Sequence, residues 1–453
     1  MTDTSVAQHQ ESKQYPLSFT QEWFVTMDQG DDGGPFGRRF LIVFALRITG
    51  PVDVAVLQGA LDDVVERHEL LRTLVVRDAD PAYQLVSPPC QVPLEVRELR
   101  AVTDRNMAIQ ELIVEVQAAT ISAREVPLMR ALFCRFDDRD SALFLTVHHS
   151  VSDGWSVQVI LRDLGAFYAA RHTGIPAKLP AVRQYREYVE WQRASATSAD
   201  DGALKYWAEK LDGARETVIP NDHGHPEKYS RPYSLHVFTI EPETIAGASA
   251  LANATRSTLF AVILASVYVR MSQLTGITDL AVRAITAGRN ELQFHNTMGL
   301  FLNVLPIRTE LADCTSFRDL VMRTRENFID AMANELPIGL LEQTFPDYIR
   351  SREDRMMSEI LISVPQGQFG ELNLPISEGA TEISEVLLEE SESSDIPSGT
   401  VWYLSIQPDG SLSGGVHFNQ DEFERSTVDG WTTGFSQVMA SAVRDPDQDW
   451  RQI

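Results

Sequence analysis

The sequence predicts an α/β protein made of two lobes, on three observations. The chain has 453 residues, which is long for one domain and comfortable for two. Apolar residues recur at helical spacing in some segments and form short strand-like runs in others. The segment TGIPAKLP (residues 173–180) is typical of a boundary between lobes. We therefore expect a disordered N-terminus over residues 1–14, an N-terminal lobe over residues 15–180 and a C-terminal lobe over residues 181–453.

The N-terminal lobe should contain a helix, a strand and then a second strand followed by a helix. Asp53 is a good N-cap for the first helix. One face of that helix is formed by Val54, Leu57, Leu61, Val64, Val65 and His68. The runs at residues 71–76 and 143–147 have the pattern of strands. After Gly154, helical spacing returns with Val157, Ile160, Leu161, Leu164, Phe167 and Tyr168. The stretch HHSVSDG (residues 148–154) is therefore predicted on a strand-to-helix turn.

The C-terminal lobe should also alternate helices and strands. We expect a buried helix over residues 257–271, a strand over residues 280–286, and a turn entering a strand over residues 410–423. The acidic run EISEVLLEESESSD (residues 382–395) is predicted as a solvated loop.

Composition excludes some classes of partner. The net charge of −25 and the pI near 4.8 argue against nucleic acid and anionic membranes, which carry the same sign of charge. Cys90, Cys134 and Cys314 lie far apart and form no CxxC spacing, so they suggest neither a disulfide framework nor a structural zinc site. The N-terminus is polar, and no apolar run approaches the ~18 residues needed to span a bilayer. We expect a cytoplasmic protein.

The adjacent histidines admit several interpretations. A histidine at the end of a strand is commonly a structural residue. His149 and Asp153, four residues apart, also resemble part of a metal site, although few candidate ligands cluster here. A serine hydrolase using Ser150 or Ser152 is rejected, because G-x-S-x-G is missing. The position favours acid/base chemistry, since an imidazole titrates near neutral pH and a helix N-terminus follows it.

A resemblance to a known family favours the acid/base interpretation. HHSVSDG matches the HHxxxDG motif of the condensation domains of nonribosomal peptide synthetases, which belong with the chloramphenicol acetyltransferase-like acyltransferases. Further segments fit the same family: SFTQEWF (18–24), RHELLRT (67–73), YREYVEWQ (185–192), KYWAEKL (205–211), AGRN (287–290) and MGLFLNVLPIR (298–308). The resemblance covers residues 15–440. Two later motifs are degenerate, at residues 333–339 and 352–360, which puts the substrate channels or carrier contacts in doubt.

The resemblance implies a fold and a reaction. The fold is two chloramphenicol acetyltransferase-like lobes in a V-shaped pseudo-dimer with a central tunnel, the C-terminal lobe carrying bridge and latch segments. An acyl group would be transferred from the phosphopantetheine thioester of an acyl or peptidyl carrier protein. His149 would be the base, or the positioner, for the acceptor. His148 would shape the turn, with a direct role as the alternative.

The resemblance also assigns roles to neighbouring residues. Asp153 would be architectural and pair with Arg289, with Arg67 as the rival partner. Gly154 would allow close approach of a substrate or of backbone.

The backbone amides of Trp155 and Ser156 would stabilise the oxyanion. Gly299 and Asn303 would lie in the bridge, either lining the substrate channel or simply forming a turn.

No adenylation motif or carrier segment is found, so we expect a free-standing enzyme that meets its carrier in trans. The chain is most similar to the ester-forming enzymes of enediyne antibiotic pathways, which predicts a small-molecule acceptor attacking through a hydroxyl. No bound cofactor or metal is expected. The alternatives are amide formation, transfer from coenzyme A, epimerisation and a non-catalytic recruiting domain. The basic segment 171–193 is either a carrier-docking surface or a solvated linker.

Overall fold

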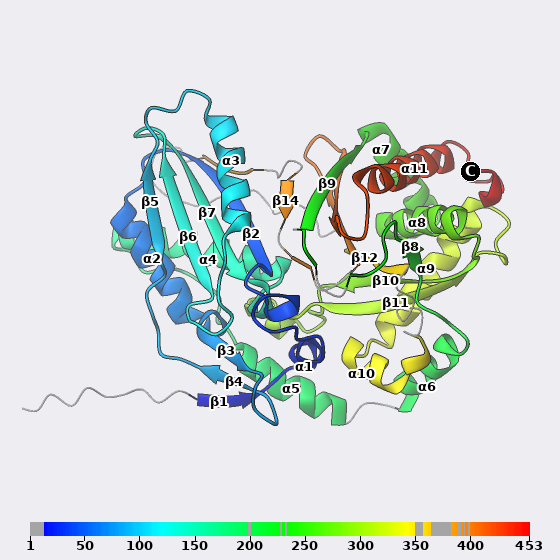
Figure 1. Ribbon diagram of the computed structural model, residues 1–453, viewed down its shortest axis with the longest axis horizontal. Helices are drawn as coiled ribbons and strands as arrows, with labels where there is room; N and C mark the ends of the chain where they lie inside the picture. The colour runs from blue at the N-terminus through cyan, green and yellow to red at the C-terminus, as the bar shows by residue number, and fades with distance from the viewer. Residues whose placement is uncertain are drawn as a thin grey trace, which may run out of the picture. The chain divides into compact units, whose positions relative to one another are not determined.

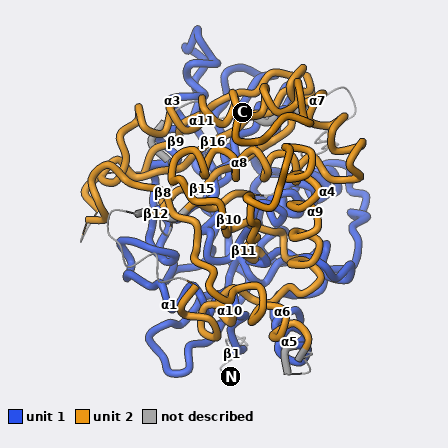
Figure 2. The backbone as a smooth tube through the Cα atoms, turned by 90° about the vertical axis from the view of Figure 1, so that its right-hand side faces the viewer, with its two compact units in different colours: residues 1–197, 289–301, 371–387 blue, residues 198–288, 302–370, 388–453 orange. Residues whose placement is uncertain are grey.

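The computed structural model describes residues 13–197, 201–226, 229–231, 233–348, 357–363, 382–386, 391–393, 395–396 and 399–453. The chain divides into two compact units (Figure 2). Unit 1 comprises residues 1–197, 289–301 and 371–387, and unit 2 comprises residues 198–288, 302–370 and 388–453.

The boundary between the units differs from the predicted one. Unit 1 continues beyond residues 173–180 to Thr197 and includes the helix α5 (Tyr185–Thr197). The hydroxyl of Tyr185 explains why, because it lies 2.8 Å from Ser18 Oγ and donates to the carbonyl of Leu300 at 2.7 Å, both in unit 1. The loop-like segment 173–180 thus lies inside unit 1, because the helix that follows it packs against residues of unit 1.

Unit 1 contains the following helices, with 3-10 turns marked η: α1 (Phe19–Thr26), η1 (Gly34–Phe36), α2 (Val54–Arg67), η2 (Glu69–Arg72), α3 (Arg105–Ala118), η3 (His149–Val151), α4 (Gly154–Thr173), α5 and η4 (Leu292–Phe294). Its strands are β1 (Lys13–Pro16), β2 (Leu41–Thr49), β3 (Thr73–Val76), β4 (Tyr83–Val86), β5 (Leu94–Glu98), β6 (Met129–Arg135), β7 (Asp140–His148) and β13 (Glu382–Glu385). The predicted strands at 71–76 and 143–147 correspond to β3 and β7.

The main sheet of unit 1 has the order β13-β2-β7-β6-β5 among the described strands, with β5 and β6 parallel. Figure 1 labels β2, β7, β6 and β5 of this sheet. β7 is central, and eight of its nine residues are buried, which explains its nearly continuous apolar sequence. Leu41 at the start of β2 pairs with His148 at the end of β7. The chain entering β2 therefore lies beside the histidine pair.

Helices α2 and α4 pack against each other in this unit. Asp53 caps α2, as predicted, by accepting from the amides of Ala55 and Val56. Leu57, Leu61, Val64 and Val65 on α2 are buried, and so are Val157, Ile160, Leu161, Leu164 and Tyr168 on α4. α4 ends at Thr173 and is capped by Gly174, whose φ of 75° is the left-handed conformation that glycine adopts without strain.

The N-terminus partly contradicts its predicted disorder. Residues 1–12 lie outside the described residues. Lys13 and Gln14, however, belong to β1, which pairs antiparallel with β4 in a small sheet of order β1-β4-β3. Backbone pairing with β4 orders these polar residues without requiring burial of their side chains.

Unit 2 contains the helices α6 (Asp201–Leu211), α7 (Pro242–Ala254), α8 (Leu259–Thr275), α9 (Phe317–Ala333), α10 (Ile338–Thr344), α11 (Arg425–Arg444) and η6 (Trp450–Gln452). Its strands are β8 (Val218–Pro220), β9 (Tyr233–Ile240), β10 (Asp279–Thr286), β11 (Asn303–Glu310), β12 (Met357–Ser363), β14 (Ser391–Ser393), β15 (Thr400–Ile406) and β16 (Leu412–Asn419). The predicted helix over 257–271 and strand over 280–286 correspond to α8 and β10.

The described strands of unit 2 form a sheet of order β11-β10-β12-β15-β16-β9-β14, with β8 paired to β12. Helices α7, α8 and α11 pack together, and Phe435 of α11 contacts Trp402 and Phe238 of the sheet. Among the described helices, none alone is long and apolar enough to span a membrane, although α7 and α8 together meet that test with a bend of 108°.

The acidic run at residues 382–395 is not wholly a loop, contrary to the prediction. It contains β13, which pairs antiparallel with β2, and β14, which pairs antiparallel with β9. Each strand is at the end of its sheet among the described strands, a position that tolerates a charged sequence. Charge alone therefore does not exclude a strand here.

Candidate active site

The histidine pair lies on the predicted strand-to-helix turn. β7 ends at His148, η3 begins at His149, and α4 begins at Gly154. Asp153 is the N-cap of α4 and accepts a hydrogen bond from the Ser156 amide at 2.8 Å. The whole turn belongs to unit 1.

His148 is a buried structural residue in this arrangement. Its Nε2 donates to the carbonyl of Gly37 at 3.1 Å, and its Nδ1 accepts from the amide of Ser150 at 3.1 Å. Burial lowers the pKa of His148 to about 3, so the ring is neutral near pH 7. Both ring nitrogens are occupied, which favours the turn-shaping role over the direct one.

His149 differs sharply from its neighbour. Its amide donates to the carbonyl of Phe40 at 2.8 Å, and its ring stacks on the Phe40 ring, with centroids 4.6 Å apart and planes 8° apart. Its Nδ1 is buried and has no hydrogen-bond partner among the described residues. Burial lowers the pKa of His149 below the usual histidine value. The result is a neutral imidazole, the form that can accept a proton.

Asp153 pairs with Arg289, which confirms the predicted partner. Oδ2 lies 2.8 Å from Nη1 and Oδ1 lies 3.2 Å from Nη2. Oδ2 also accepts from the amide of Phe301 at 3.0 Å. With the bond from Ser156 to Oδ1, both carboxylate oxygens are fully engaged, as expected for an architectural residue.

Arg67, the rival partner, lies elsewhere. Its Nε donates to Asp163 Oδ2 at 2.7 Å, and the same oxygen lies 2.9 Å from His68 Nε2. Asp163 is fully buried on α4 and takes Arg67 away from Asp153. Arg67 therefore holds α2 to α4 and does not shape the histidine turn.

The predicted oxyanion donors are only partly available. The amide of Ser156 is used by Asp153, which rules it out as a donor. The side-chain hydroxyl of Ser156 lies 2.7 Å from the carbonyl of Gly299 and accepts from the Gly299 amide at 2.9 Å. Trp155 is anchored by its indole, which donates to the carbonyl of His295 at 2.9 Å.

Gly154 has open space around its Cα. A Cβ added at Gly154 meets no atom within 4 Å among the described residues, and Gly154 is exposed. The space above the first turn of α4 is therefore open to an approaching group.

Gly299 and Asn303 are not placed as channel residues. Gly299 is buried, and a Cβ there would lie 2.2 Å from the ring of Tyr185, so glycine is required for packing. In unit 2, the Asn303 amide donates to Glu335 Oε1 at 2.8 Å and to the Leu336 carbonyl at 2.9 Å, while its oxygen accepts from the Ile338 amide at 3.0 Å. The Asn303 side chain thus holds the start of α10.

The geometry gives little support to a serine hydrolase or to a metal site. Ser150 Oγ lies 2.8 Å from His148 Nδ1, but both side chains are buried. In the part of the chain that the structure describes, no group of three or more His, Cys, Asp or Glu side chains could hold a metal ion.

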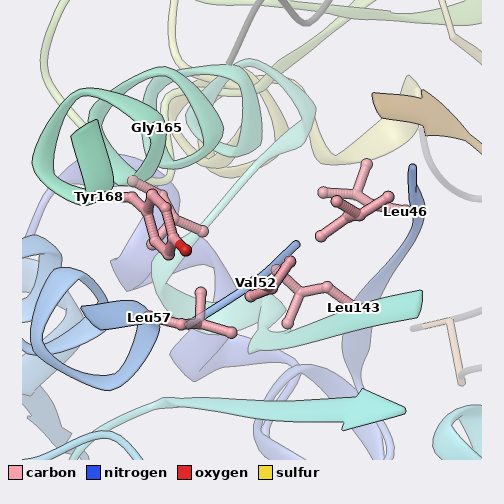
Figure 3. A pocket seen from close by; sticks show the side chains of 8 residues that line it. Leu46, Val52, Leu57, Leu143, Gly165 and Tyr168 are labelled. Atoms are coloured by element: carbon pink, nitrogen blue, oxygen red, sulfur yellow. The ribbon is translucent and has the colours of Figure 1, made fainter. Parts of the chain in front are cut away.

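A small apolar cavity of about 10 Å³ lies in unit 1, away from the histidine turn (Figure 3). It is lined by Leu46, Ile48, Val52, Leu57, Leu143, Leu164, Gly165 and Tyr168. Leu143 lies near the start of β7, whereas His148 ends that strand. A water-sized apolar void of this kind is a packing defect and not a substrate site.

Sequence reasoning missed Phe40 and Tyr185. Phe40 carries the stacking contact to His149, and Tyr185 fills the space left by Gly299. The motif YREYVEWQ indicated that Tyr185 mattered, but no pattern in the sequence indicated which aromatic residue lies against the imidazole.

Comparison with known proteins identifies the family. The family model described as Condensation domain matches residues 11–453. A linear gramicidin synthase of Brevibacillus parabrevis is 30% identical over 97% of this chain and 8% of its own length. The dimodular nonribosomal peptide synthase of Bacillus subtilis (strain 168) is 30% identical over 96% of this chain and 18% of its own length. The chain thus spans less than a fifth of either relative.

Solved structures agree. SgcC5 from Streptomyces globisporus matches with a TM-score of 0.87 and 32% identity, covering 96% of this chain and 100% of that one. The X-domain from teicoplanin biosynthesis matches with a TM-score of 0.79 and 21% identity, covering 99% and 98%, which shows the shared fold alone. The chain belongs to the condensation-domain family and is an acyltransferase with the chloramphenicol acetyltransferase-like α/β fold.

Proposed function

We propose that this enzyme transfers an acyl or aminoacyl group from the phosphopantetheine thioester of a carrier protein to the hydroxyl of a small molecule, forming an ester in natural-product biosynthesis. The observation that carries the proposal is the neutral imidazole of His149 at the end of β7, whose Nδ1 has no partner in the described part of the chain. A hydroxyl is a weak nucleophile until a base removes its proton, whereas a neutral amine can attack first.

His149 is the only side chain that needs to accept and return a proton in this reaction. The imidazole accepts the hydroxyl proton as the oxygen attacks the thioester carbonyl. The new C–O bond forms, the C–S bond breaks, and the imidazolium returns its proton to the departing thiolate. Asp153 takes no part in proton transfer, because Arg289, Ser156 and Phe301 occupy its carboxylate.

Developing negative charge on the carbonyl oxygen needs a donor nearby. The first turn of α4 supplies the positive end of a 20-residue helix. The backbone amide of Ser156 already donates to Asp153. We therefore assign the stabilisation of the oxyanion to the backbone amides of Gly154 and Trp155.

The alcohol acceptor is supported by SgcC5. That protein was crystallised with (R)-(-)-1-(2-naphthyl)-1,2-ethanediol, a vicinal diol, and sucrose. We infer that the acceptor of this chain is an alcohol, and that the carrier protein is supplied in trans.

The carrier partner should meet the basic segment 171–193. Three of its five cations are engaged within unit 1: Arg171 with Asp63, Arg186 with Glu69, and Arg193 with Glu22. Lys178 and Arg183 are exposed. We propose these two side chains as the contacts to an acidic carrier, which narrows the surface expected from the sequence.

One assay tests the proposal. Purified enzyme is incubated with acyl-loaded carrier protein and, in parallel, with a vicinal diol and the matched amino alcohol, and products are identified by mass spectrometry. We expect acylation of the diol oxygen. Acylation of only the amine would replace ester formation with amide formation. Equal transfer from acyl-coenzyme A without a carrier would favour the coenzyme A-dependent alternative.

A further inference from the structure

His149 lacks the carboxylate that usually orients a catalytic imidazole. In a serine-protease triad, an aspartate accepts from Nδ1 and fixes the ring. Here Nδ1 of His149 is buried without a hydrogen-bond partner among the described residues. Asp153, four residues away, cannot serve, because its oxygens are engaged by Arg289, Ser156 and Phe301. The backbone groups of His149 and Ser152 interact with the ring, but no carboxylate in the described part of the chain fixes its plane.

Phe40 lies where it can do so. Its ring stacks on the imidazole with planes 8° apart and centroids 4.6 Å apart. Its carbonyl accepts from the His149 amide at 2.8 Å, so backbone and side chain contact the same residue. Phe40 itself is only 4% exposed, and its amide donates to the carbonyl of Gly37 at 3.0 Å.

The support for Phe40 is also tied to the other histidine. The carbonyl of Gly37 that accepts from the Phe40 amide also accepts from His148 Nε2, at 3.1 Å. Residues 37–40 are thus bound to both members of the pair. This arrangement gives the buried His148 a function, since it fixes the backbone that presents the Phe40 ring.

We propose that Phe40 is the positioning residue for His149, whose ring it holds by stacking in the plane from which a ring nitrogen faces the acceptor hydroxyl. The inference rests on the proposed role of His149 as base. Rotation about χ2 of histidine is soft, so an unrestrained imidazole samples many orientations. A stacked aromatic ring removes that freedom by covering the face of the imidazole, and it does not cover the edge that carries the ring nitrogens.

Such a role has a distinct kinetic signature. Misorientation of a catalytic group lowers the rate of the chemical step by as much as about 100-fold and leaves ground-state binding of the acceptor largely intact. Phe40→Leu should therefore lower kcat roughly 10- to 100-fold with KM for the acceptor close to wild type. Phe40→Tyr, which keeps an aromatic face, should retain most of the activity.

The test compares variants of the full chain with the wild type. Phe133→Leu is the matched control, because Phe133 is a fully buried phenylalanine on β6 of the same sheet. Its melting temperature should fall as in Phe40→Leu, with kcat unchanged. If Phe40→Leu does not fold, Phe40→Met provides the same loss of the aromatic face with a bulkier flexible chain. The last variant combines Phe40→Leu with His149→Ala.

The double variant tests whether Phe40 affects the rate through His149. If Phe40 acts through His149, the double variant should be no slower than His149→Ala alone. Rate losses that multiply, a Phe40→Leu enzyme with normal kcat, or a Phe40→Tyr enzyme as slow as Phe40→Leu would each overturn the positioning role. Failure of the proposed function has a different signature, since His149→Ala alone would then turn over normally.

Discussion

The carboxylate of Asp153 and the guanidinium of Arg289 form a two-point ion pair, with distances of 2.8 and 3.2 Å, in which both side chains are almost completely buried. The pair joins the first turn of α4 to residues 289–301, which return to unit 1 from far along the chain. Arg289 also lies 3.9 Å above the ring centroid of Phe301. Asp153 therefore links two segments of unit 1 that are far apart in the sequence.

Asp153→Ala should lower stability as well as rate. Removing one partner strands the Arg289 charge in a buried site, which costs about 3 to 5 kcal/mol. We expect a clearly lower melting temperature and poor solubility. Asp447→Ala is the control, because its pair with Arg318 at 2.6 Å is exposed, so solvent screening leaves that pair little effect on stability. An Asp153→Ala protein that melts like the wild type but is inactive would indicate a direct catalytic role.

Gly299→Ala should destabilise unit 1 by overpacking. The new methyl would lie 2.2 Å from Cδ2 of Tyr185, and the Tyr185 ring is itself buried. Overpacking of this kind costs typically about 1 to 3 kcal/mol. Gly430→Ala in α11 meets no atom within 4 Å and should be neutral or slightly stabilising. Thermal melting compares the two, and a Gly299→Ala protein of normal stability with raised KM would restore the channel assignment.

His148 should make stability depend on pH in mildly acidic solution. Its pKa is about 3 in the folded protein against 6.5 ordinarily, so between these values the unfolded chain binds the extra proton. The contribution of His148 to the free energy of unfolding is therefore fully present above pH 6.5. It is lost as the pH falls below that value, by up to about 1.4 kcal/mol per pH unit. Urea unfolding from pH 7 to 5 should show a shallower pH slope in His148→Gln. The exposed His172 provides the control, and a slope in His148→Gln equal to that in His172→Gln would contradict the assignment.

Reversing the charges of Lys178 and Arg183 should weaken recognition of the carrier. We expect Lys178→Glu combined with Arg183→Glu to raise KM for the loaded carrier severalfold, with kcat at saturation unchanged and with weaker dependence on salt. Lys205→Glu, at a side chain 78% exposed in unit 2, should have no effect. An unchanged KM in the double reversal would remove this segment from the docking surface.

Local patterns predicted several elements of the fold. Asp53 and the apolar face after it predict α2, and the apolar run before His148 predicts β7. These predictions succeed because capping and periodicity depend on residues that are neighbours in the sequence. β13 was missed since its strand character comes from pairing with β2, more than 300 residues earlier. The unit boundary was missed for a similar reason, namely the contact of Tyr185 with Ser18.

Some features of the candidate site were also predictable from the sequence, and others were not. Resemblance to the family predicted the pairing of Asp153 with Arg289, which the structure confirms. The use of the Ser156 amide by Asp153, and the stacking of Phe40 on His149, depend on three-dimensional geometry that no spacing in the sequence encodes. These are the two contacts that decide which groups remain available for chemistry.

The central claim is that His149 is the base for an alcohol acceptor, and one measurement tests it most directly. Turnover of the wild type and of His149→Ala is compared on a vicinal diol and on the matched amino alcohol, with the same acyl-loaded carrier. Loss of a positioned base should lower ester formation roughly 10²- to 10⁴-fold, while amide formation, in which the amine can attack before it loses its proton, should fall much less. Equal losses for both acceptors, or normal ester formation by a folded His149→Ala enzyme, would contradict the account.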